Sequence, residues 1–392
     1  MPLKRFLVFL SSARFDDKST RKDRVQSDKL SAICDLYDSF ACKCRNSYRP
    51  SSFVCIDETL IGFRGRCPFR MYIPSKPDRY GIKNWSMCDN GTNYLCNLQM
   101  YLGKVGSTPE LHQGARVMTD LAEPLFGSGR NVTVDNFFTS YALGQSLLSK
   151  NVTTLGTIRK NKTELPHSVL VAKRPEHESI FAFTADTTLV SYAPKKNRSV
   201  ILMSTMHNKP EVDTDGRGRK PYMILDYNAT KGAVDAFDQC ISYYTCARQT
   251  RRWPMRLFFF LIDAACYNAF VLWKLTSEKP NKRVDRRRLF LTEAGEKLIR
   301  PFIEIRANVP TISHQPSVAR AMLSVGVQPV LLKPESQKSR KRGRCHACPR
   351  KKDIKVENQC IECEQFVCQQ HAEKKLICKS CRPRPTIEDV LA

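Results

Sequence analysis

The sequence predicts a mixed α/β fold, and three observations support this prediction. Short segments rich in β-branched and aromatic residues, bounded by Gly, Pro and Asn, recur from residue 53 onward. Segments with apolar residues at helical spacing lie before, between and after them. The chain has 392 residues, of which 42% are hydrophobic, enough for about two to three domains with a sizeable core. Strands that alternate with helices favour α/β layers over a helical bundle.

Residues 1–50 are expected to form one or two helices. Asp28 precedes an apolar stripe at helical spacing. The stripe consists of Leu30, Ile33, Leu36, Tyr37 and Phe40. The apolar core at residues 6–10 is shorter than the ~7 to 15 residues of a signal peptide. No run approaches the ~18 to 20 apolar residues of a membrane span, so we expect a soluble intracellular protein with no membrane partner.

The next elements follow in order along the chain. Strands are expected at residues 53–56, 70–73, 85–87, 94–101 and 132–134, with helices at 109–122 and 139–149. A polar, proline-containing stretch at 162–221 indicates an inserted module of strands and loops. Helical periodicity returns at 232–242 and 255–275. A proline-rich connection at 301–334 then leads to a separate small tail domain.

The charge of the chain favours a polyanionic partner. The sequence has 64 Lys and Arg residues against 38 Asp and Glu, a formal net charge of +26 at pH 7. Such an excess suits the release of counterions from nucleic-acid phosphates. A ribosomal or membrane-surface protein would share this composition, so charge alone does not identify the polyanion.

Four aspartates in this basic chain point to a metal site. Asp57 and Asp135 each follow an apolar β-rich run and are expected at the carboxyl ends of strands, where open α/β sheets bind ligands. Asp235 and Asp238 share one face of a predicted helix. Converging carboxylates suit Mg²⁺, and two such ions can activate a nucleophile and stabilise a leaving oxygen at phosphorus. The alternative is that each Asp caps an element or pairs with an arginine.

Basic residues follow the first aspartate closely and alternate with aromatic ones. The basic residues that we expect to contact DNA here are Arg64, Arg66, Arg70 and Lys76. Such a segment would place phosphate-binding groups and stacking surfaces beside the metal ions. A solvated strand face with aromatic packing beneath it would show the same pattern.

The C-terminal region predicts two structural zinc ions. Seven of the 17 cysteines lie between residues 345 and 381, which indicates metal ligation in a reduced compartment rather than a disulfide framework. In a cross-brace, alternate ligand pairs share one ion. The expected sets are Cys345, Cys348, Cys368 and His371 for one ion, and Cys360, Cys363, Cys378 and Cys381 for the other. Cross-brace units act as ubiquitin ligases, histone-tail readers or DNA binders, so the partner stays open.

Several blocks of the sequence resemble the piggyBac family of DNA transposases. The longest is C-I-D-E-T-L-I-G-F-R-G-R-C-P-F-R-M-Y-I-P-S-K-P-D-R-Y-G-I-K at residues 55–83. The shorter matches are M-C-D-N-G-T at 87–92, Y-L-G at 101–103, V-D-N-F-F-T-S at 134–140, G-T-I-R-K-N-K at 156–162, T-K-G-A-V-D-A-F-D-Q at 230–239 and T-R-R-W-P at 250–254. The resemblance therefore covers nearly the whole chain.

The resemblance implies an RNase H-like catalytic core of the DDE/DDD class. Asp57, Asp135 and Asp235 match the family's metal-binding triad for two Mg²⁺ ions, and Asp238 matches a fourth functional aspartate. The implied activity is cut-and-paste transposition, with cleavage at terminal inverted repeats, hairpins on the transposon ends and joining at T-T-A-A targets. A nuclease and strand transferase of this kind is expected in the nucleus.

The resemblance also implies contacts with double-stranded DNA and a homodimer. Arg159 and Lys162 match a basic pair that contacts target DNA, and Arg251, Arg252 and Trp253 match an R-W-P motif beside the transposon end. The family's C-terminal domain binds inverted-repeat DNA. The basic run at 338–344 fits phosphate contacts or a nuclear localisation signal.

We therefore expect four regions. They are a helical dimerisation and DNA-binding domain at 1–52 and 246–335, incomplete at its N-terminus; the catalytic core at 53–161 and 222–245; the insertion module at 162–221; and the zinc domain at 336–384. Compared with the family, the N-terminal region is short. This favours an alternative function, a domesticated, non-mobilising DNA-binding or chromatin-associated protein, whereas the intact aspartates favour an active transposase. A ubiquitin ligase acting through the tail is a third possibility.

Overall fold

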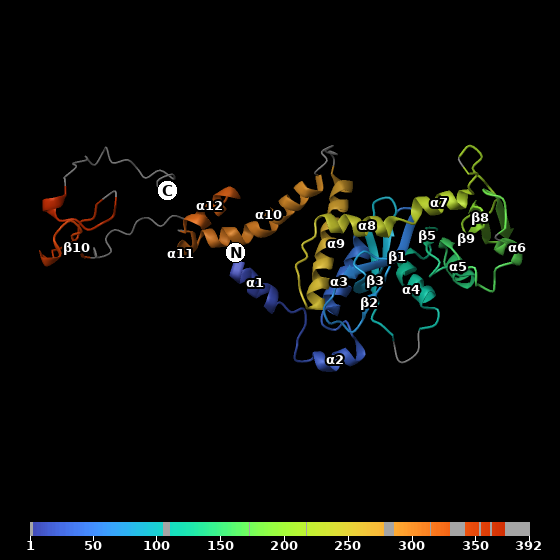
Figure 1. Cartoon of the computed structure of the whole chain (residues 1–392), viewed down its shortest axis with the longest axis horizontal. Coiled ribbons are helices and arrows are strands. Elements are labelled where there is room, and N and C mark those ends of the chain that lie inside the picture. Colours follow the sequence, from blue (N-terminus) through green and yellow to red (C-terminus); the bar gives the residue numbers. More distant parts are fainter. Residues whose placement is uncertain are drawn as a thin grey trace. The chain divides into compact units, whose positions relative to one another are not determined.

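The computed structural model describes residues 3–104, 110–171, 173–216, 218–277, 286–313, 315–329, 342–352, 354–360 and 363–372. The chain forms two compact units, Met1–Arg288 and Leu289–Ala392. Figure 1 shows the helices and strands of both units. The mixed α/β fold expected from the sequence is confirmed, while the four regional boundaries stay predictions.

A mixed sheet forms the centre of the first unit. Its nine described strands are β1 (Phe53–Gly62), β2 (Arg70–Tyr72), β3 (Tyr80–Asp89), β4 (Leu95–Met100), β5 (Asn131–Val134), β6 (Thr153–Thr157), β7 (Ser179–Phe183), β8 (Thr188–Lys195) and β9 (Arg198–Ser204). Their order is β2-β3-β1-β5-β6-β9-β8-β7, with β4 paired to β3. Because β9 pairs with β6, the strands of the expected insertion at 162–221 continue the central sheet.

Helices cover both faces of this sheet. The described helices of the first unit are α1 (Leu3–Ser12), α2 (Arg21–Ser27), α3 (Cys34–Ser47), α4 (Gln113–Ala122), α5 (Tyr141–Leu148), α6 (His167–Leu170), α7 (Tyr222–Thr230), α8 (Ala233–Tyr243) and α9 (Trp253–Thr276), with a short 3-10 turn at Glu123–Leu125. The expectation of one or two helices within residues 1–50 was wrong, since three form. Asp16 and Asp17 lie between α1 and α2, where Asp16 accepts a hydrogen bond from Arg24 of α2 and Asp17 accepts one from the Ser19 N–H.

Strand β1 shows which helices lie on which face. Cys55 Sγ donates to the Lys231 carbonyl at 3.1 Å and Thr59 Oγ1 to Asp238 at 3.0 Å, so odd-numbered side chains face α7 and α8. Tyr37 of α3 reaches Asn84 on the same face. On the other face, Trp85 stacks on Phe137 at 5.2 Å between ring centroids, beside α4. Both faces of the sheet are therefore covered.

Helix α9 is long and apolar enough to cross a membrane by length and composition alone. Of its 18-residue apolar window, 56% is buried inside the protein, and Leu257, Phe260 and Leu261 belong to the main hydrophobic core. Asp263, also buried, accepts hydrogen bonds from Thr245 Oγ1 at 2.6 Å and the Cys246 N–H at 2.8 Å. In this structure α9 is a core helix of the first unit.

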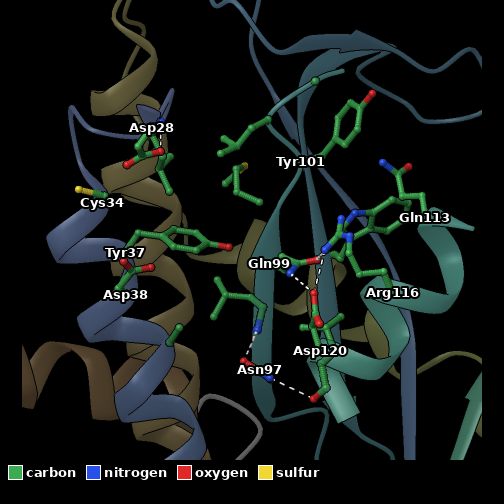
Figure 2. Close-up of a pocket in the computed structure, with 18 of the residues that line it drawn as sticks. Asp28, Cys34, Tyr37, Asp38, Asn97, Gln99, Tyr101, Gln113, Arg116 and Asp120 are labelled. Carbon is green, nitrogen blue, oxygen red and sulfur yellow. Dashed lines mark hydrogen bonds and ion pairs between the residues drawn. The ribbon is translucent and has the colours of Figure 1, made fainter. Parts of the chain in front are cut away.

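Strand β4 lies at one edge of the sheet, between α3 on one face and α4 on the other (Figure 2). Asn97 Nδ2 donates to the Leu121 carbonyl of α4, and Arg45 of α3 donates to Asn97 Oδ1 at 3.0 Å. The side chain of one strand residue thus joins the two helices across the edge.

The second unit is small in its described part. It contains most of α10 (Arg286–Ala307), then α11 (Pro310–Ser313), α12 (Pro316–Ser324), β10 (Gly343–Arg344) and β11 (Lys355–Val356), with 3-10 turns at Arg350–Lys352 and Gln369–His371. Ala307, Met322 and Val327 form a small apolar cluster between its helices. The two short strands pair antiparallel in the cysteine-rich tail.

Asp89, at the end of β3, is fully buried and joins three segments. It accepts hydrogen bonds from the Ser51 N–H at 2.7 Å, the Thr92 N–H at 2.9 Å, Thr92 Oγ1 at 2.8 Å and the Tyr48 hydroxyl at 3.1 Å. Burial opposes the charged form, but these donors outweigh it and lower the pKa of Asp89. The charged carboxylate therefore stabilises the fold.

Replacing Asp89 with Ala is expected to cost about 2 to 4 kcal/mol, because several buried donors lose their acceptor. Thermal unfolding of the full chain at pH 7 should show the first transition lowered by about 5 to 10 °C. The difference from the wild type should persist above about pH 4 and shrink as the pH falls through the lowered pKa. An equal loss in Asp23→Ala, on exposed α2, would contradict this explanation.

Candidate active site

Asp57 and Asp135 lie on neighbouring strands. In the parallel pair β1 and β5, Ile56 is the register partner of Val134, so Asp57 of β1 lies beside Asp135, the residue directly after β5. Neighbouring strands are about 4.8 Å apart. Thr133 Oγ1 lies 2.8 Å from Thr230 Oγ1 of α7, so the odd-numbered side chains of β5 face the same helices as those of β1. Both aspartates therefore face the α7 and α8 side.

The structure corrects one detail of the sequence prediction. We expected Asp57 directly after a strand, but β1 continues through Gly62. Beyond Ile56 its parallel partner β5 has ended, while the antiparallel pairing with β3 continues from Val54 to Gly62. Asp57 is thus in the middle of β1, yet at the end of its parallel portion, where the neighbouring strand no longer crowds it.

Helix α8 brings the third and fourth aspartates to the same face. Val234 and Phe237, fully buried, pack its apolar side into the main core, while Asp235 lies in its first turn, where the helix dipole favours an anion. Asp238, one turn later, accepts a hydrogen bond from Thr59, two residues after Asp57. The structure therefore brings together all four aspartates predicted from the sequence.

The surroundings of Asp57, Asp135 and Asp238 disfavour negative charge on these three carboxyl groups. Burial is the largest cause and raises the pKa of Asp57 to about 6, with further contributions from the carboxylates of Asp135 and Asp235. Burial likewise raises the pKa of Asp238 to about 7 and also raises that of Asp135. A divalent cation would relieve this cost, because it favours the ionised form of each carboxyl group.

Lys76, predicted to contact DNA, lies among these carboxylates. Its ammonium group is 3.7 Å from Asp235 Oδ1 and donates to the Glu58 carbonyl at 3.0 Å. Lys76, Asp235 and Asp238 also line a cavity of about 550 Å³ that extends to Arg256 and Asp263. A DNA contact of Lys76 would therefore occur next to the candidate metal site.

Glu58 and Lys83 form a second polar group that sequence reasoning missed. They make an ion pair at 2.6 Å, and the Lys83 ammonium lies 3.7 Å from the centroid of the Trp85 ring. Both side chains point to the face opposite Asp57, since neighbouring residues of a strand alternate. The charge of Glu58 adds to the raised pKa of Asp135, after burial. The sequence offered one signal for this second group, the acidic residue Glu58 directly after Asp57.

A second cavity, of about 750 Å³, is strongly basic. Its eleven described lining residues include six arginines and no acidic residue. The arginines are Arg64, Arg66, Arg70, Arg248, Arg251 and Arg256. Gly65 lets the segment around Arg64 approach the segment around Arg251 closely. A Cβ atom at residue 65 would lie only 2.9 Å from the Arg251 carbonyl oxygen. Four residues predicted to contact DNA therefore converge from two distant segments of the chain.

The other predicted DNA contacts have varied surroundings. Arg159 donates to Asn136, next to Asp135, at 3.1 Å, and Lys162 is half-buried in the turn after β6. Arg252 donates to the carbonyl oxygens of Leu10 and Ser11, while Trp253 packs edge-on against Phe69 with ring centroids 5.1 Å apart. The last two residues thus have packing roles within the first unit, and their contacts with DNA stay predictions.

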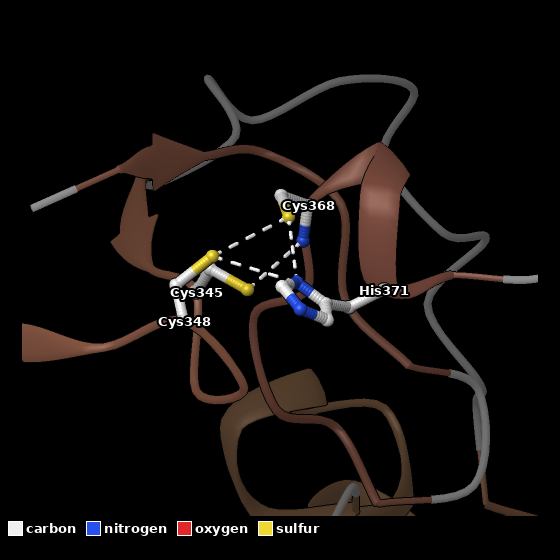
Figure 3. Close-up of side chains that lie close together, drawn as sticks. All are labelled: Cys345, Cys348, Cys368 and His371. Carbon is white, nitrogen blue, oxygen red and sulfur yellow. Dashed lines mark hydrogen bonds between the residues drawn. The ribbon is translucent and has the colours of Figure 1, made fainter. Parts of the chain in front are cut away.

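Four residues of the tail gather as expected for a metal ion. The ligand atoms of Cys345, Cys348, Cys368 and His371 all lie within 4.8 Å of one another (Figure 3). Cys348 Sγ is 3.6 Å from Cys368 Sγ, close to the ~3.8 Å between sulfur ligands of a tetrahedral zinc ion. Although desolvation opposes a thiolate, backbone N–H groups lower the pKa of Cys345 to about 6. This cluster is compatible with a zinc site.

The second expected zinc site is only partly described. Cys360 and Cys363 are both described, and the Glu364 N–H donates to the Cys360 carbonyl at 3.0 Å. Cys378 and Cys381 lie outside the described residues. The ligand set of the second ion therefore stays a prediction.

Known proteins resemble the chain in sequence. A family model described as Transposase IS4 matches residues 1–270. The human PiggyBac transposable element-derived protein 3 is 26% identical over 272 residues, which cover 64% of this chain and 45% of that protein. The human PiggyBac transposable element-derived protein 2 is 22% identical over 290 residues, 69% of this chain and 48% of that protein. The chain thus spans less than half the length of these relatives.

A solved structure provides the structural comparison. It is a cryo-EM structure of a piggyBac transposase synaptic complex with hairpin DNA, 36% identical in sequence, with a TM-score of 0.78. The alignment covers 97% of this chain and 80% of the solved chain. Together with the family match over residues 1–270, this similarity shows that the chain belongs to the piggyBac family of transposases.

Proposed function

We propose that the chain is a Mg²⁺-dependent DNA transposase that cuts and joins DNA by two-metal-ion phosphoryl transfer. The observation that carries the proposal is the register of β1 and β5. It places Asp57 and Asp135 side by side, facing the aspartates of α8. The order of the antiparallel strands β4, β3 and β1, followed by parallel β5 and β6, supports an RNase H-like core.

Asp57, Asp135 and Asp235 would hold the ions and Asp238 would support them. Bound Mg²⁺ would activate the attacking water or 3′-hydroxyl and stabilise the leaving oxygen. The carboxylates are suitable ligands because they are hard oxygen donors, and burial disfavours the ionised forms of Asp57, Asp135 and Asp238 in the absence of a cation. Thr59 fixes the orientation of Asp238 through its hydrogen bond. Lys76 would lose its contact with Asp235 as an ion binds and become available for a phosphate.

The arginine-lined cavity supports a path for DNA beside the metal site. Gly62 and Arg256 line this cavity, and Arg256 also lines the cavity that contains Asp235 and Asp238. Arg256 Nε donates to the Gly62 carbonyl at 2.9 Å, so the end of β1 joins the two cavities. We propose that transposon-end DNA occupies the arginine-lined cavity and presents its phosphate to the carboxylates. Inverted repeats and T-T-A-A targets are the DNA expected there.

The tail and the assembly complete the proposal. The cysteine cluster would hold one structural Zn²⁺ and the second ligand set another. We propose that the zinc domain binds DNA, that the working form is a homodimer, and that the protein acts in the nucleus. The printed description of the structural neighbour, a synaptic complex with hairpin DNA, supports the choice of DNA as partner.

Replacing Asp135 with Asn is expected to abolish excision while leaving DNA binding intact, because the amide is nearly isosteric but cannot neutralise a divalent cation. Excision of a T-T-A-A-flanked donor by the full chain would be measured, with loss of about 100-fold or more expected. Asp186→Asn, in an exposed turn, is the matched control. DNA binding without any Asp135-dependent cleavage in the wild type would instead support the domesticated, non-mobilising function.

Replacing Arg251 with Ala is expected to weaken binding of hairpin DNA uniformly across sequences. Each lost phosphate contact should reduce the slope of log K against log salt by about 1. Fluorescence anisotropy over a range of salt concentrations provides the measurement. Arg198→Ala, which removes an exposed arginine on β9, should leave both affinity and slope nearly unchanged. Equal effects of the two variants would indicate unspecific attraction instead of a cavity site.

Replacing Cys368 with Ser is expected to lower the zinc content of the purified chain by one ion, because Cys368 contacts both Cys348 and His371 in the cluster. Elemental analysis after dialysis would give the zinc content of each variant. Cys42→Ser, an exposed cysteine of α3, serves as control. Unchanged zinc in Cys368→Ser would remove this cluster as a metal site.

A further inference from the structure

The outer edge of β4 is the strongest unexplained feature of the first unit. Among the described strands, β4 pairs only with β3, so one row of its peptide groups faces away from the sheet. Tyr101 N–H donates to the Lys83 carbonyl at 3.0 Å, and Asn84 pairs with Met100. Because hydrogen-bonded and non-bonded pairs alternate in antiparallel strands, the peptide groups of Leu98 and Met100 point outward.

Two neighbouring outward groups already have partners. Asn97 Oδ1 accepts from the Leu98 N–H at 3.0 Å, and Lys29 Nζ donates to the Leu102 carbonyl at 3.1 Å. Between them lie the Leu98 carbonyl and both peptide groups of Met100. These three groups belong to residues two apart on the same strand edge. An added strand can therefore form backbone hydrogen bonds with them.

This edge is the floor of a groove of about 610 Å³ between α3 and α4. Figure 2 shows Asp28, Tyr37 and Asp38 on the α3 side and Gln113, Arg116 and Asp120 on the α4 side, with Gln99 and Tyr101 between them. The volume lies within the range of about 300 to 1,000 Å³ typical of ligand sites. An extended peptide along β4 would therefore have a wall on each side.

The charge of the groove is opposite to that of the chain. Four carboxylates and two guanidinium groups line it, a net charge of −2 in a chain of +26. Arg116 pairs with Asp120 at 2.8 Å and Arg45 donates to Asn97. Asp28 and Asp38 form no ion pair with any described residue. By contrast, the cavity proposed to bind DNA has six arginines and no acid among its described lining.

We propose that this groove binds an extended basic segment of a partner protein, which adds to the β4 edge as a short antiparallel or parallel strand. Successive side chains of such a strand point to opposite faces. One basic side chain would therefore meet Asp38 on the α3 wall and its neighbour would meet Asp120 on the α4 wall. The favoured segment has at least two consecutive Lys or Arg residues. Nucleic acid is excluded because it would meet carboxylates on both walls.

The proposal can be tested with a labelled Val-Lys-Arg-Lys-Val peptide and the full chain. Fluorescence anisotropy should show saturable binding, and Asp38→Lys should weaken it about tenfold or more, because the charge at one wall is reversed. Asp23→Lys makes the same charge change on an exposed residue of α2, which does not line the groove, and should leave binding nearly unchanged. Asp38→Asn, a milder change, should weaken binding less than Asp38→Lys.

A second peptide distinguishes strand addition from simple charge attraction. The same sequence with every backbone amide N-methylated keeps its charges but cannot donate to the Leu98 and Met100 carbonyls. It should bind at least about tenfold more weakly than the unmodified peptide. Equal binding of both peptides, equal loss in the two Lys variants, or no saturable binding would each overturn the proposal. None of these measurements depends on excision activity.

Discussion

The two different pairings of β1 are the constraint on which the rest of the site depends. This strand runs antiparallel to β3 along its whole length but parallel to β5 only as far as Ile56. Cys55 donates to the turn between α7 and α8, and Thr59 donates to α8; these two hydrogen bonds hold β1 in register. A slip of one residue would move Asp57 to the opposite face, beside Trp85. The register therefore determines whether the aspartates meet at all.

The same arrangement has a cost in stability. Because the pKa values of Asp57 and Asp238 are raised to about 6 and about 7, the protein loses folding free energy as the pH rises from about 4 to about 7. Elsewhere in the unit a buried aspartate is stabilising, since Asp89 has four hydrogen-bond donors around it. The contrast is informative. The fold supplies hydrogen-bond donors that outweigh the burial of Asp89, but burial outweighs the donors around Asp57 and Asp238, where a cation is expected.

The sequence pattern predicted the kinds of element well and their extents less well. Apolar alternation and turn residues located β1 to β5 and the helices α4, α5, α8 and α9, because these segments are buried on regular faces. The extension of β1 beyond Asp57 was missed because Glu58 and Thr59 are polar and do not continue the apolar pattern. Their partners, Lys83 and Ser86, lie on β3 and cannot be identified from the local sequence. The resemblance brought in Arg159 and Arg252, but only coordinates show that Arg252 donates to carbonyl groups near α1. The spacing of the tail cysteines grouped Cys345, Cys348, Cys368 and His371, and the structure brings these four residues together.

The edge of β4 could not be anticipated from sequence, because an edge position is a property of topology. Exposed edges invite pairing with other chains, and proteins normally blunt them with charges or covering segments. Here the side chains of Lys29 and Asn97 form hydrogen bonds with the peptide groups at the two ends of the edge, while carboxylates flank the middle. Such walls repel nucleic acid. They would also repel an acidic chain, so the walls favour basic strands. In a protein of charge +26 this selectivity has a further consequence, since the groove would keep one face of the first unit free of the DNA that we propose for the arginine-lined cavity.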